Sequence, residues 1–148
     1  MKIYLATDHA GYDLKEDVKK FLVDNKYEVE DLGALKYDQE DDYPDYILPA
    51  AKAVSEHPED KAIVFGGSGQ GEAMVANRFK GVHATVYYGG SKNIIRLSKE
   101  HNDANVLSIG ARFVSSSKAK KIIKLWLETE FSNEERHVRR IKKIDQVN

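Results

Sequence analysis

Residues 62–79 read AIVFGGSGQGEAMVANRF, and this stretch decides the fold of the chain. The first four residues are apolar, residues 66–71 are glycine, serine and glutamine, and a helical pattern begins at Glu72. This order predicts a buried strand, a glycine turn and a helix. Glycines let the backbone approach a ligand closely, and the unpaired N–H groups at a helix start favour anions. We therefore predict an anion-binding turn at residues 66–71.

Glu72 lies in the first turn of the predicted helix, where two interpretations fit it. A carboxylate beside N–H groups that hold a ligand is placed to take a proton from that ligand, which would make the turn an oxyanion cradle with a base. A glutamate in a first turn also complements the helix dipole without any catalytic role. Glu72 follows Ser68 by four residues rather than three, so the two do not form a capping box.

Length and composition restrict the class of protein. A chain of 148 residues suits one domain, and a net charge of −1 gives no global argument for nucleic acid or a membrane surface. The chain has no cysteine, which excludes disulfides and thiol catalysis and agrees with a reducing compartment. No apolar stretch approaches the roughly 18 residues of a membrane helix, and the N-terminus lacks a signal-peptide core. We expect a soluble, cytoplasmic protein.

The rest of the chain repeats the order of strand and helix. Short apolar runs predict strands over residues 3–6, 27–32, 62–65, 83–88 and 105–109. Helical spacing of apolar residues, with a basic last segment, predicts helices over residues 14–22, 47–54, 73–79, 94–98, 119–127 and 136–143. Ile94 and Ile95 are both expected to face inward, and Pro49 is expected to bend or delay its helix. The charged residues 36–42 predict an exposed loop.

Alternating strands and helices indicate a single α/β domain over residues 1–148, with a parallel sheet covered on both faces. Right-handed crossovers bring the carboxyl ends of all strands to one edge. The turns at residues 7–11, 66–71 and 110–112 follow three of these strands, so we expect them to converge there. Open α/β sheets bind their ligands at this edge.

Three common phosphate and nucleotide motifs do not fit the glycine turn. Gly67, Gly69 and Gly71 are spaced as GxGxG, and no acid ends the next strand to hold a ribose, which argues against a nicotinamide or flavin site. No Lys-Ser or Lys-Thr pair follows the glycines, so a P-loop is excluded. A phosphoacceptor receiver domain needs paired acids and a lysine after the fifth strand, where residues 110–112 read GAR.

Other polar residues allow more than one interpretation. Asp8 and His9 follow the first strand, but no acid or histidine repeats at ligand spacing, so we expect no metal and a helix cap at Asp8. His101 ends a helix, either as a favourable cation at the dipole or as a catalytic group. Arg136 and Arg140 are one helical turn apart, which suits a phosphate clamp or a solvated basic face. Nucleic-acid contact is the weakest alternative, because no aromatic residues separate these charges.

A set of motifs, in order along nearly the whole chain, carries a resemblance to a known family. They are Asp8-His9-Ala10-Gly11, Asp42-Tyr43-Pro44, GGSGQGE at 66–72, Ala76-Asn77, HNDANV at 101–106, Gly110-Ala111-Arg112 and RHVRR at 136–140. Together they resemble the family of ribose-5-phosphate isomerase B and the galactose-6-phosphate isomerase subunits. The resemblance implies a Rossmann-like αβα sandwich with a five-stranded parallel sheet, and a homodimer or dimer of dimers that isomerises a sugar phosphate without a cofactor.

The resemblance also implies roles for the matching residues. One branch of the family uses a cysteine base where this chain has Gly66, and the other uses a glutamate further along the turn, as here. Glu72 would move the proton between C1 and C2 of the sugar, and His101 would open the sugar ring. The implied substrate-binding residues are Asp8, His9, Gly67, Ser68, Gly69, Gln70, Gly71, Asn102, Arg112, Arg136, His137 and Arg140. The last helix of the family reaches a partner subunit, so Arg136 and Arg140 would serve the neighbour's crevice.

The expected reaction converts D-ribose 5-phosphate to D-ribulose 5-phosphate through a cis-enediolate. A tetrose phosphate or a hexose phosphate, such as galactose 6-phosphate or allose 6-phosphate, stays open as the substrate. One reason is the segment YYGGS at 87–91, which is longer than the usual turn of the family and is expected at the crevice rim. A nucleotide-binding module without catalysis is the alternative from another class, although it gives Glu72 and His101 no joint purpose. No cofactor, metal, membrane or nucleic acid is expected as a partner.

Overall fold

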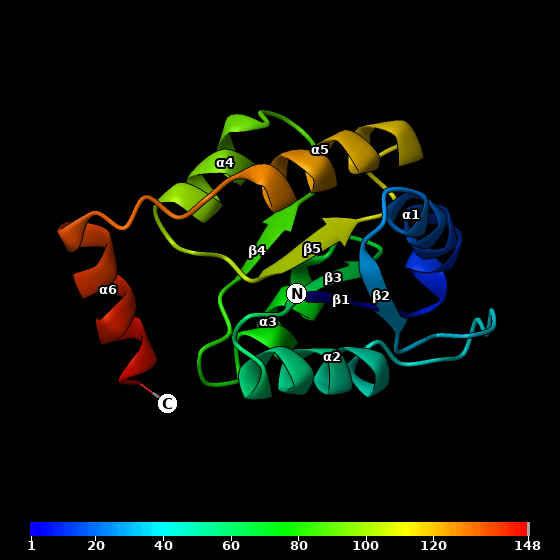
Figure 1. Ribbon diagram of the computed structural model, residues 1–148. Coiled ribbons are helices and arrows are strands. Elements are labelled where there is room, and N and C mark those ends of the chain that lie inside the picture. The colour runs from blue at the N-terminus through cyan, green and yellow to red at the C-terminus, as the bar shows by residue number, and fades with distance from the viewer. Residues whose placement is uncertain (148) are drawn as a thin grey trace.

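The centre of the molecule is a five-stranded parallel sheet, shown in Figure 1. The computed structural model describes residues 1–147. The strands lie in the spatial order β2-β1-β3-β5-β4, and every neighbouring pair is parallel. Their bounds are β1 Lys2–Thr7, β2 Glu28–Asp31, β3 Lys61–Gly66, β4 Ala84–Tyr87 and β5 Val106–Gly110. Because β3 is central, the glycine turn that follows it leaves from the middle of the sheet.

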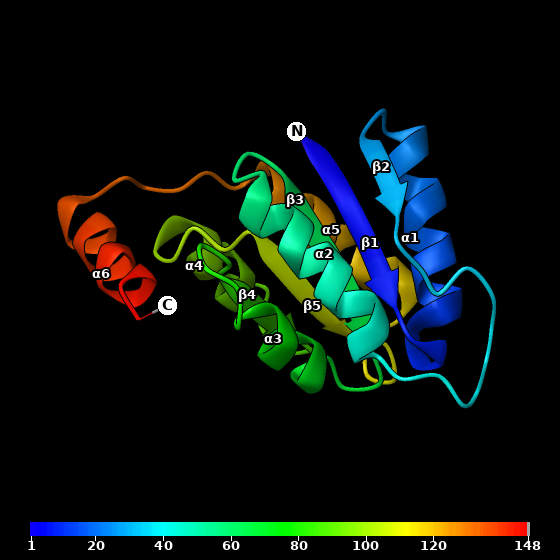
Figure 2. The same cartoon turned by 90° about the horizontal axis from the view of Figure 1, so that it is seen from below.

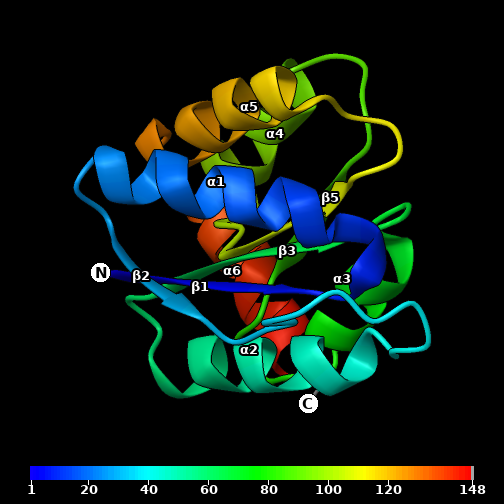
Figure 3. The ribbon, with the colours of Figure 1, turned by 90° about the vertical axis from the view of Figure 1, so that its right-hand side faces the viewer.

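Helices cover both faces of this sheet. They are α1 Tyr12–Asp24, which follows the short 3-10 helix η1 His9–Gly11, then α2 Pro44–Glu56, α3 Gln70–Ala76, α4 Asn93–Glu100, α5 Ser116–Glu128 and α6 Glu135–Asp145. Figure 3 shows α1, α4 and α5 on one face of the sheet and α2 and α3 on the other. The predicted Rossmann-like αβα sandwich is confirmed. Within residues 1–147, no helix has both the length and the apolar character needed to cross a membrane.

Side chains alternate along β3, as expected of a strand buried on both faces. Ile63 and Phe65 belong to the core beneath α1, α4 and α5. Ala62 and Val64 belong to the second core, beneath α2 and α3. All four side chains are at most 1% exposed. Burial on both sides fixes the path of β3 and therefore the point at which the chain enters the glycine turn.

Each observed strand end lies within one residue of its prediction, but one helix prediction is wrong. Ile94 does not face inward: it is 58% exposed, because α4 is rotated so that Ile95 and Ser98 face the core. Pro49 does not delay its helix, since α2 begins at Pro44 and runs through Pro49. Proline removes one helical hydrogen bond, and here the carbonyl left without that partner belongs to Asp45, an exposed residue near the helix start.

The last helix, α6, covers neither face of the sheet. Residues 129–134 lead away from α5, and Figure 2 shows α6 apart from the sandwich, on the far side of α4. His137 is the buried residue of this helix. The end of α6 is tied to the start of β4, because His83 Nε2 lies 2.7 Å from Asp145 Oδ1. The reach of α6 to a partner subunit stays a prediction.

Candidate active site

The glycine turn is held against the end of β5. Backbone N–H groups of Ala111 and Arg112 donate to the carbonyls of Gly66 and Gly67 over 2.8 and 3.1 Å. The Ser108 hydroxyl donates to the Gly69 carbonyl over 2.6 Å. Gly69 has φ +78°, a conformation that side-chain-bearing residues rarely adopt, and a Cβ there would lie 3.1 Å from the Gly110 nitrogen. The turn is therefore fixed in shape before any ligand arrives.

Glu72 is the buried carboxylate of this turn, with 4% of the residue exposed. Its carboxylate lies against Gly66, where a Cβ would overlap both oxygens. Burial raises the pKa of Glu72, the negative charge of Asp8 raises it further, and the Glu72 backbone N–H partly offsets both. A carboxylate with a raised pKa is a stronger base than an exposed one. Its position and its environment both suit proton abstraction.

The turn after β1 contributes Asp8 and His9 to the same edge. The Thr7 hydroxyl donates to the Phe65 carbonyl over 3.0 Å, which joins this turn to the end of β3. Asp8 caps η1, because its side chain accepts from the Ala10 N–H over 3.0 Å. The N-cap of α1 itself is Gly11, so the cap predicted at Asp8 lies on the short helix that precedes α1.

His9 is held by a residue that the sequence did not single out. Its Nδ1 lies 2.7 Å from Asp41 Oδ1, and its backbone N–H donates to the same oxygen over 3.0 Å. Asp8, His9 and Asp41 have ligand atoms close enough to share a metal ion. A separation of 2.7 Å is a direct hydrogen bond, however, so the group needs no ion to explain its geometry.

Arg112 completes the edge. Its guanidinium lies over Gly67, where a Cβ would be 3.0 Å from Nη1. Asp8, His9, residues 67–71, Glu72 and Arg112 thus meet at the carboxyl ends of β1, β3 and β5, and the predicted convergence of three turns is confirmed. We call this set the crevice group. It combines a buried base, backbone donors and two cation-forming side chains.

A second set of predicted residues lies elsewhere. His101 and Asn102 follow α4, and the His101 ring stacks on that of His137 with a centroid separation of 4.3 Å. His137 is 3% exposed, and its Nε2 is buried with no hydrogen-bond partner among the residues that the structure describes. Arg136 and Arg140 lie on the same helix as His137, with exposed side chains. We call these five residues the α6 group.

One chain does not bring the two groups together. Asn102 shares a hollow of about 300 Å³ with His83 and Ala84, at the start of β4, whereas Glu72 packs against the end of β3. Ala84 pairs with Val106, and Gly66 pairs with Gly110 four residues later on β5, a separation of about 13 Å along the strand. Figure 1 shows the same opposition, with α6 at the left and the arrowheads of β4 and β5 pointing right.

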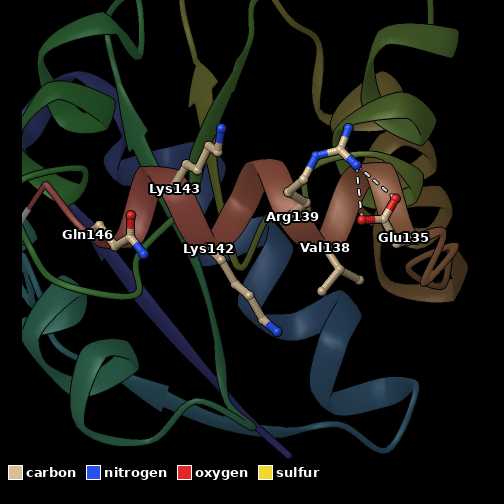
Figure 4. Close-up of a pocket in the computed structure, with 6 residues that line it drawn as sticks. All are labelled: Glu135, Val138, Arg139, Lys142, Lys143 and Gln146. Carbon is tan, nitrogen blue, oxygen red and sulfur yellow. Dashed lines mark hydrogen bonds and ion pairs between the residues drawn. The ribbon is translucent and has the colours of Figure 1, made fainter.

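A hollow of about 470 Å³ runs along α6 but belongs to neither group. Figure 4 shows that its lining residues all come from one helix, with Arg139 and Lys143 pointing to one side and Val138 and Lys142 to the other. Arg139 is already paired with Glu135 over 2.8 Å. Within residues 1–147 this hollow has no opposing wall, so in the single chain it is a basic helix face and not a candidate ligand site.

Sequence reasoning missed three residues that shape the crevice and its frame. Asp41 holds His9, and the Tyr43 hydroxyl packs where a Cβ of Gly71 would lie. Asn77 bonds both backbone groups of Ala84, over 2.8 and 3.2 Å, and so joins the end of α3 to β4. Tyr43 and Asn77 could have been identified from the sequence, because they belong to the motifs Asp42-Tyr43-Pro44 and Ala76-Asn77. Nothing in the sequence distinguishes Asp41 from the other acidic residues around it.

An open parallel sheet with polar side chains and a glycine turn gathered at the carboxyl ends of its central strands is the arrangement in which α/β proteins bind small ligands. A family model described as Ribose/Galactose Isomerase matches residues 3–144. The chain belongs to this family, and with it to the aldose–ketose isomerases.

Individual relatives agree with the family assignment. The chain is 38% identical over 141 residues to ribose-5-phosphate isomerase B of Mycobacterium tuberculosis, covering 95% of this chain and 86% of the relative. A crystal structure of ribose-5-phosphate isomerase B from Mycoplasma genitalium with bound ribulose-5-phosphate superposes with a TM-score of 0.93 at 37% identity, covering 99% of this chain and 95% of that one. The enzyme from Clostridium thermocellum gives 0.93 at 39% identity, with 99% and 97% covered.

Proposed function

We propose that this protein is a cofactor-independent isomerase that converts D-ribose 5-phosphate to D-ribulose 5-phosphate, with residues 1–148 acting as one catalytic domain in the cytoplasm. The observation that carries the proposal is the Glu72 carboxylate, buried against the glycine turn with a raised pKa. The choice of substrate is supported by relatives named ribose-5-phosphate isomerase B and by the neighbour that holds ribulose-5-phosphate.

In the proposed reaction, His101 first helps to open the sugar ring. Glu72 then removes the proton from C2 of the aldose, and the C–H electron pair forms the C1–C2 double bond as the C1 carbonyl becomes an oxyanion. Protons redistribute between O2 and O1, the C2 carbonyl forms, and Glu72 returns its proton to C1. One base on one face of a cis-enediolate serves both transfers.

The oxyanion needs donors aimed at the place where charge develops. Backbone N–H groups of residues 67–71 are proposed to supply them, with the turn held rigid by its bonds to β5. One such donor is worth about 3 kcal/mol of the barrier. Asp8 is assigned to the sugar hydroxyls, and His9 and Arg112 to the phosphate.

The position of the Glu72 carboxylate also supports its role. The resemblance implies that some relatives carry a cysteine base where this chain has Gly66. The Glu72 oxygens occupy the space that a side chain at residue 66 would enter. We infer that the glutamate reaches the same point of the crevice from α3, and that glycine at residue 66 makes room for it.

We further propose that the active site is shared between two copies of the chain, in a homodimer or dimer of dimers. The crevice group lacks a ring-opening acid, and the α6 group lacks a base. Because the two groups lie at opposite ends of β5, His101, Asn102, Arg136, His137 and Arg140 of one copy would complete the crevice of the other. Two arginines one turn apart can hold a phosphate from two directions.

The test is incubation with four-, five- and six-carbon aldose phosphates in deuterated water, with isomerisation and deuterium at C1 or C2 as readouts. We expect turnover and deuterium incorporation with ribose 5-phosphate. Preference for galactose 6-phosphate or allose 6-phosphate would move the proposal to hexose phosphates, which the family description also allows. Absence of isomerisation with every sugar would refute the proposed activity.

A further inference from the structure

Asp41 lies in the otherwise exposed loop between β2 and α2, yet its side chain is only 5% exposed. Its Oδ1 accepts from the His9 backbone N–H over 3.0 Å and lies 2.7 Å from His9 Nδ1. One carboxylate oxygen therefore fixes both the main chain and the ring of His9. A contact at two points specifies the direction of the ring, which a single contact does not.

The neighbours of His9 single out Asp41 as the residue that holds the ring. The nearest Asp8 oxygen is 3.9 Å from Nδ1, beyond hydrogen-bond distance. Tyr37, from the same loop as Asp41, packs edge-on against the ring with centroids 6.2 Å apart. The loop thus brings the Asp41 carboxylate and the Tyr37 ring into contact with His9. Because Nδ1 is bonded to Asp41, Nε2 is the ring nitrogen that can bind a ligand.

We propose that Asp41 is a positioning residue that, by bonding both the backbone N–H and Nδ1 of His9, leaves Nε2–H directed as the donor to the substrate phosphate. The inference rests on the proposed function only in naming a phosphate as the ligand. A histidine held this way presents a positive charge and a directed N–H together, which suits a phosphate dianion.

The charges that face His9 agree with this role. The hydrogen bond to Asp41 is the largest influence on the pKa of His9 and raises it, and the charge of Asp8 raises it further. Partial burial and the positive charge of Arg112 lower the pKa but do not outweigh the two acids. Within residues 1–147, Asp41 Oδ2 is buried without a hydrogen-bond partner, whereas Oδ1 makes both contacts with His9.

The direct test is NMR titration of the His9 imidazole in the wild-type protein, in Asp41→Asn, and in Asp38→Asn as the matched control. Asp38 lies in the same loop, and its side chain bonds only the local Glu40 N–H. His9→Gln identifies the resonance. We expect the His9 pKa to lie above that of a free histidine in the wild type and in Asp38→Asn, and to fall in Asp41→Asn.

Binding of inorganic phosphate gives the second readout. Asparagine can still accept the two hydrogen bonds but carries no charge, so Asp41→Asn should bind phosphate about tenfold more weakly near pH 8, a loss of about 1.4 kcal/mol. Near pH 5.5 the difference should vanish, because His9 is then protonated in both proteins. A merely structural role would weaken binding equally at both pH values.

The positioning role is overturned by an unshifted His9 pKa in folded Asp41→Asn, or by a loss of phosphate binding that does not depend on pH. If Asp41→Asn does not fold, the wild-type titration decides: a His9 pKa at or below the free value, or an unprotonated Nδ1, contradicts the proposal. Absence of turnover with every aldose phosphate would instead contradict the isomerase assignment, since the titration needs no turnover.

Discussion

At the scale of single residues, Glu72 shows how a group can suit catalysis and oppose folding. Its pKa is raised because burial disfavours the charged form and Asp8 adds a like charge. The folded state therefore binds the Glu72 proton more tightly than the unfolded state does. Its contribution to stability falls as pH rises through the folded pKa, so the folded protein is less stable with Glu72 in the ionised form that the proposed proton abstraction needs.

Glu72→Gln is predicted to lower kcat by about 10²- to 10⁴-fold, the usual contribution of a general base, while raising the melting temperature at pH 7. The stabilisation should shrink as pH falls, because Glu72 is then neutral in the wild type. Steady-state kinetics and thermal melts at several pH values measure both effects. Glu128→Gln, at an exposed site on α5, is the control and should change neither. A variant with normal kcat would remove Glu72 from the mechanism.

Gly66→Ala tests the same carboxylate without altering it. The added Cβ would overlap the Glu72 carboxyl group and must displace it. A displacement of about 1 Å costs about 10²-fold in rate, so we expect a fall of at least that size in kcat. Far-ultraviolet circular dichroism should match the wild type. Full activity in a folded Gly66→Ala protein would show that the carboxylate need not lie where the structure has it.

At the scale of elements, the helices are set by their ends as much as by their apolar faces. Ser115 lies just before α5, in extended conformation, and its hydroxyl accepts from the Lys118 N–H over 3.2 Å. The helix it starts carries Ile122, Ile123 and Trp126 into the core beneath α1 and α4. Loss of the Ser115 cap would therefore disturb the helix that places Trp126, the largest of the fully buried side chains, in the core.

Ser115→Ala is predicted to destabilise the fold by about 1 kcal/mol, the usual cost of losing a serine cap. For a chain of this length that corresponds to a fall of about 2–4 °C in melting temperature. Ser117→Ala, two residues into the exposed first turn of α5, is the control and should have little effect. Equal melting temperatures for both variants would show that the Ser115 cap contributes nothing.

The predictions from sequence succeeded where the pattern is local. Strand ends and the glycine turn follow from runs of apolar residues and from the abrupt change at Gly66. The inward face of α4 did not follow, because Ile94 and Ile95 compete for one position and only packing decides between them. The contact between Asp41 and His9 spans 32 residues of chain, so no local pattern could reveal it.

At the scale of the whole molecule, the fold divides the predicted site residues between the two ends of the sheet. A helix that returns from the carboxyl edge of a parallel sheet must end at the opposite edge, so the place of His101 follows from topology alone. The family resemblance assigns His101 and Glu72 to one active site, whereas the fold places them at opposite ends of the sheet. The proposed second copy of the chain would reconcile this separation with a single reaction by supplying the missing half of the site.

Mixed dimers test this arrangement. Glu72→Gln and His101→Ala should each be inactive alone, but equal mixing after subunit exchange should restore about one quarter of wild-type activity. Random pairing makes half of the dimers mixed, and each mixed dimer has one intact site. Glu72→Gln mixed with Arg140→Ala should likewise recover activity, in proportion to the residual binding of the arginine variant. Failure to recover activity in verified mixed dimers would contradict shared sites.

The place of the Glu72 carboxyl group beside Gly66 has one more consequence. A sulfur nucleophile at that point could be oxidised through sulfenic to sulfonic acid, and the last steps are irreversible. A carboxylate cannot be oxidised in this way, and the whole chain lacks cysteine. Peroxide that inactivates a thiol base would leave the Glu72 carboxylate chemically unchanged.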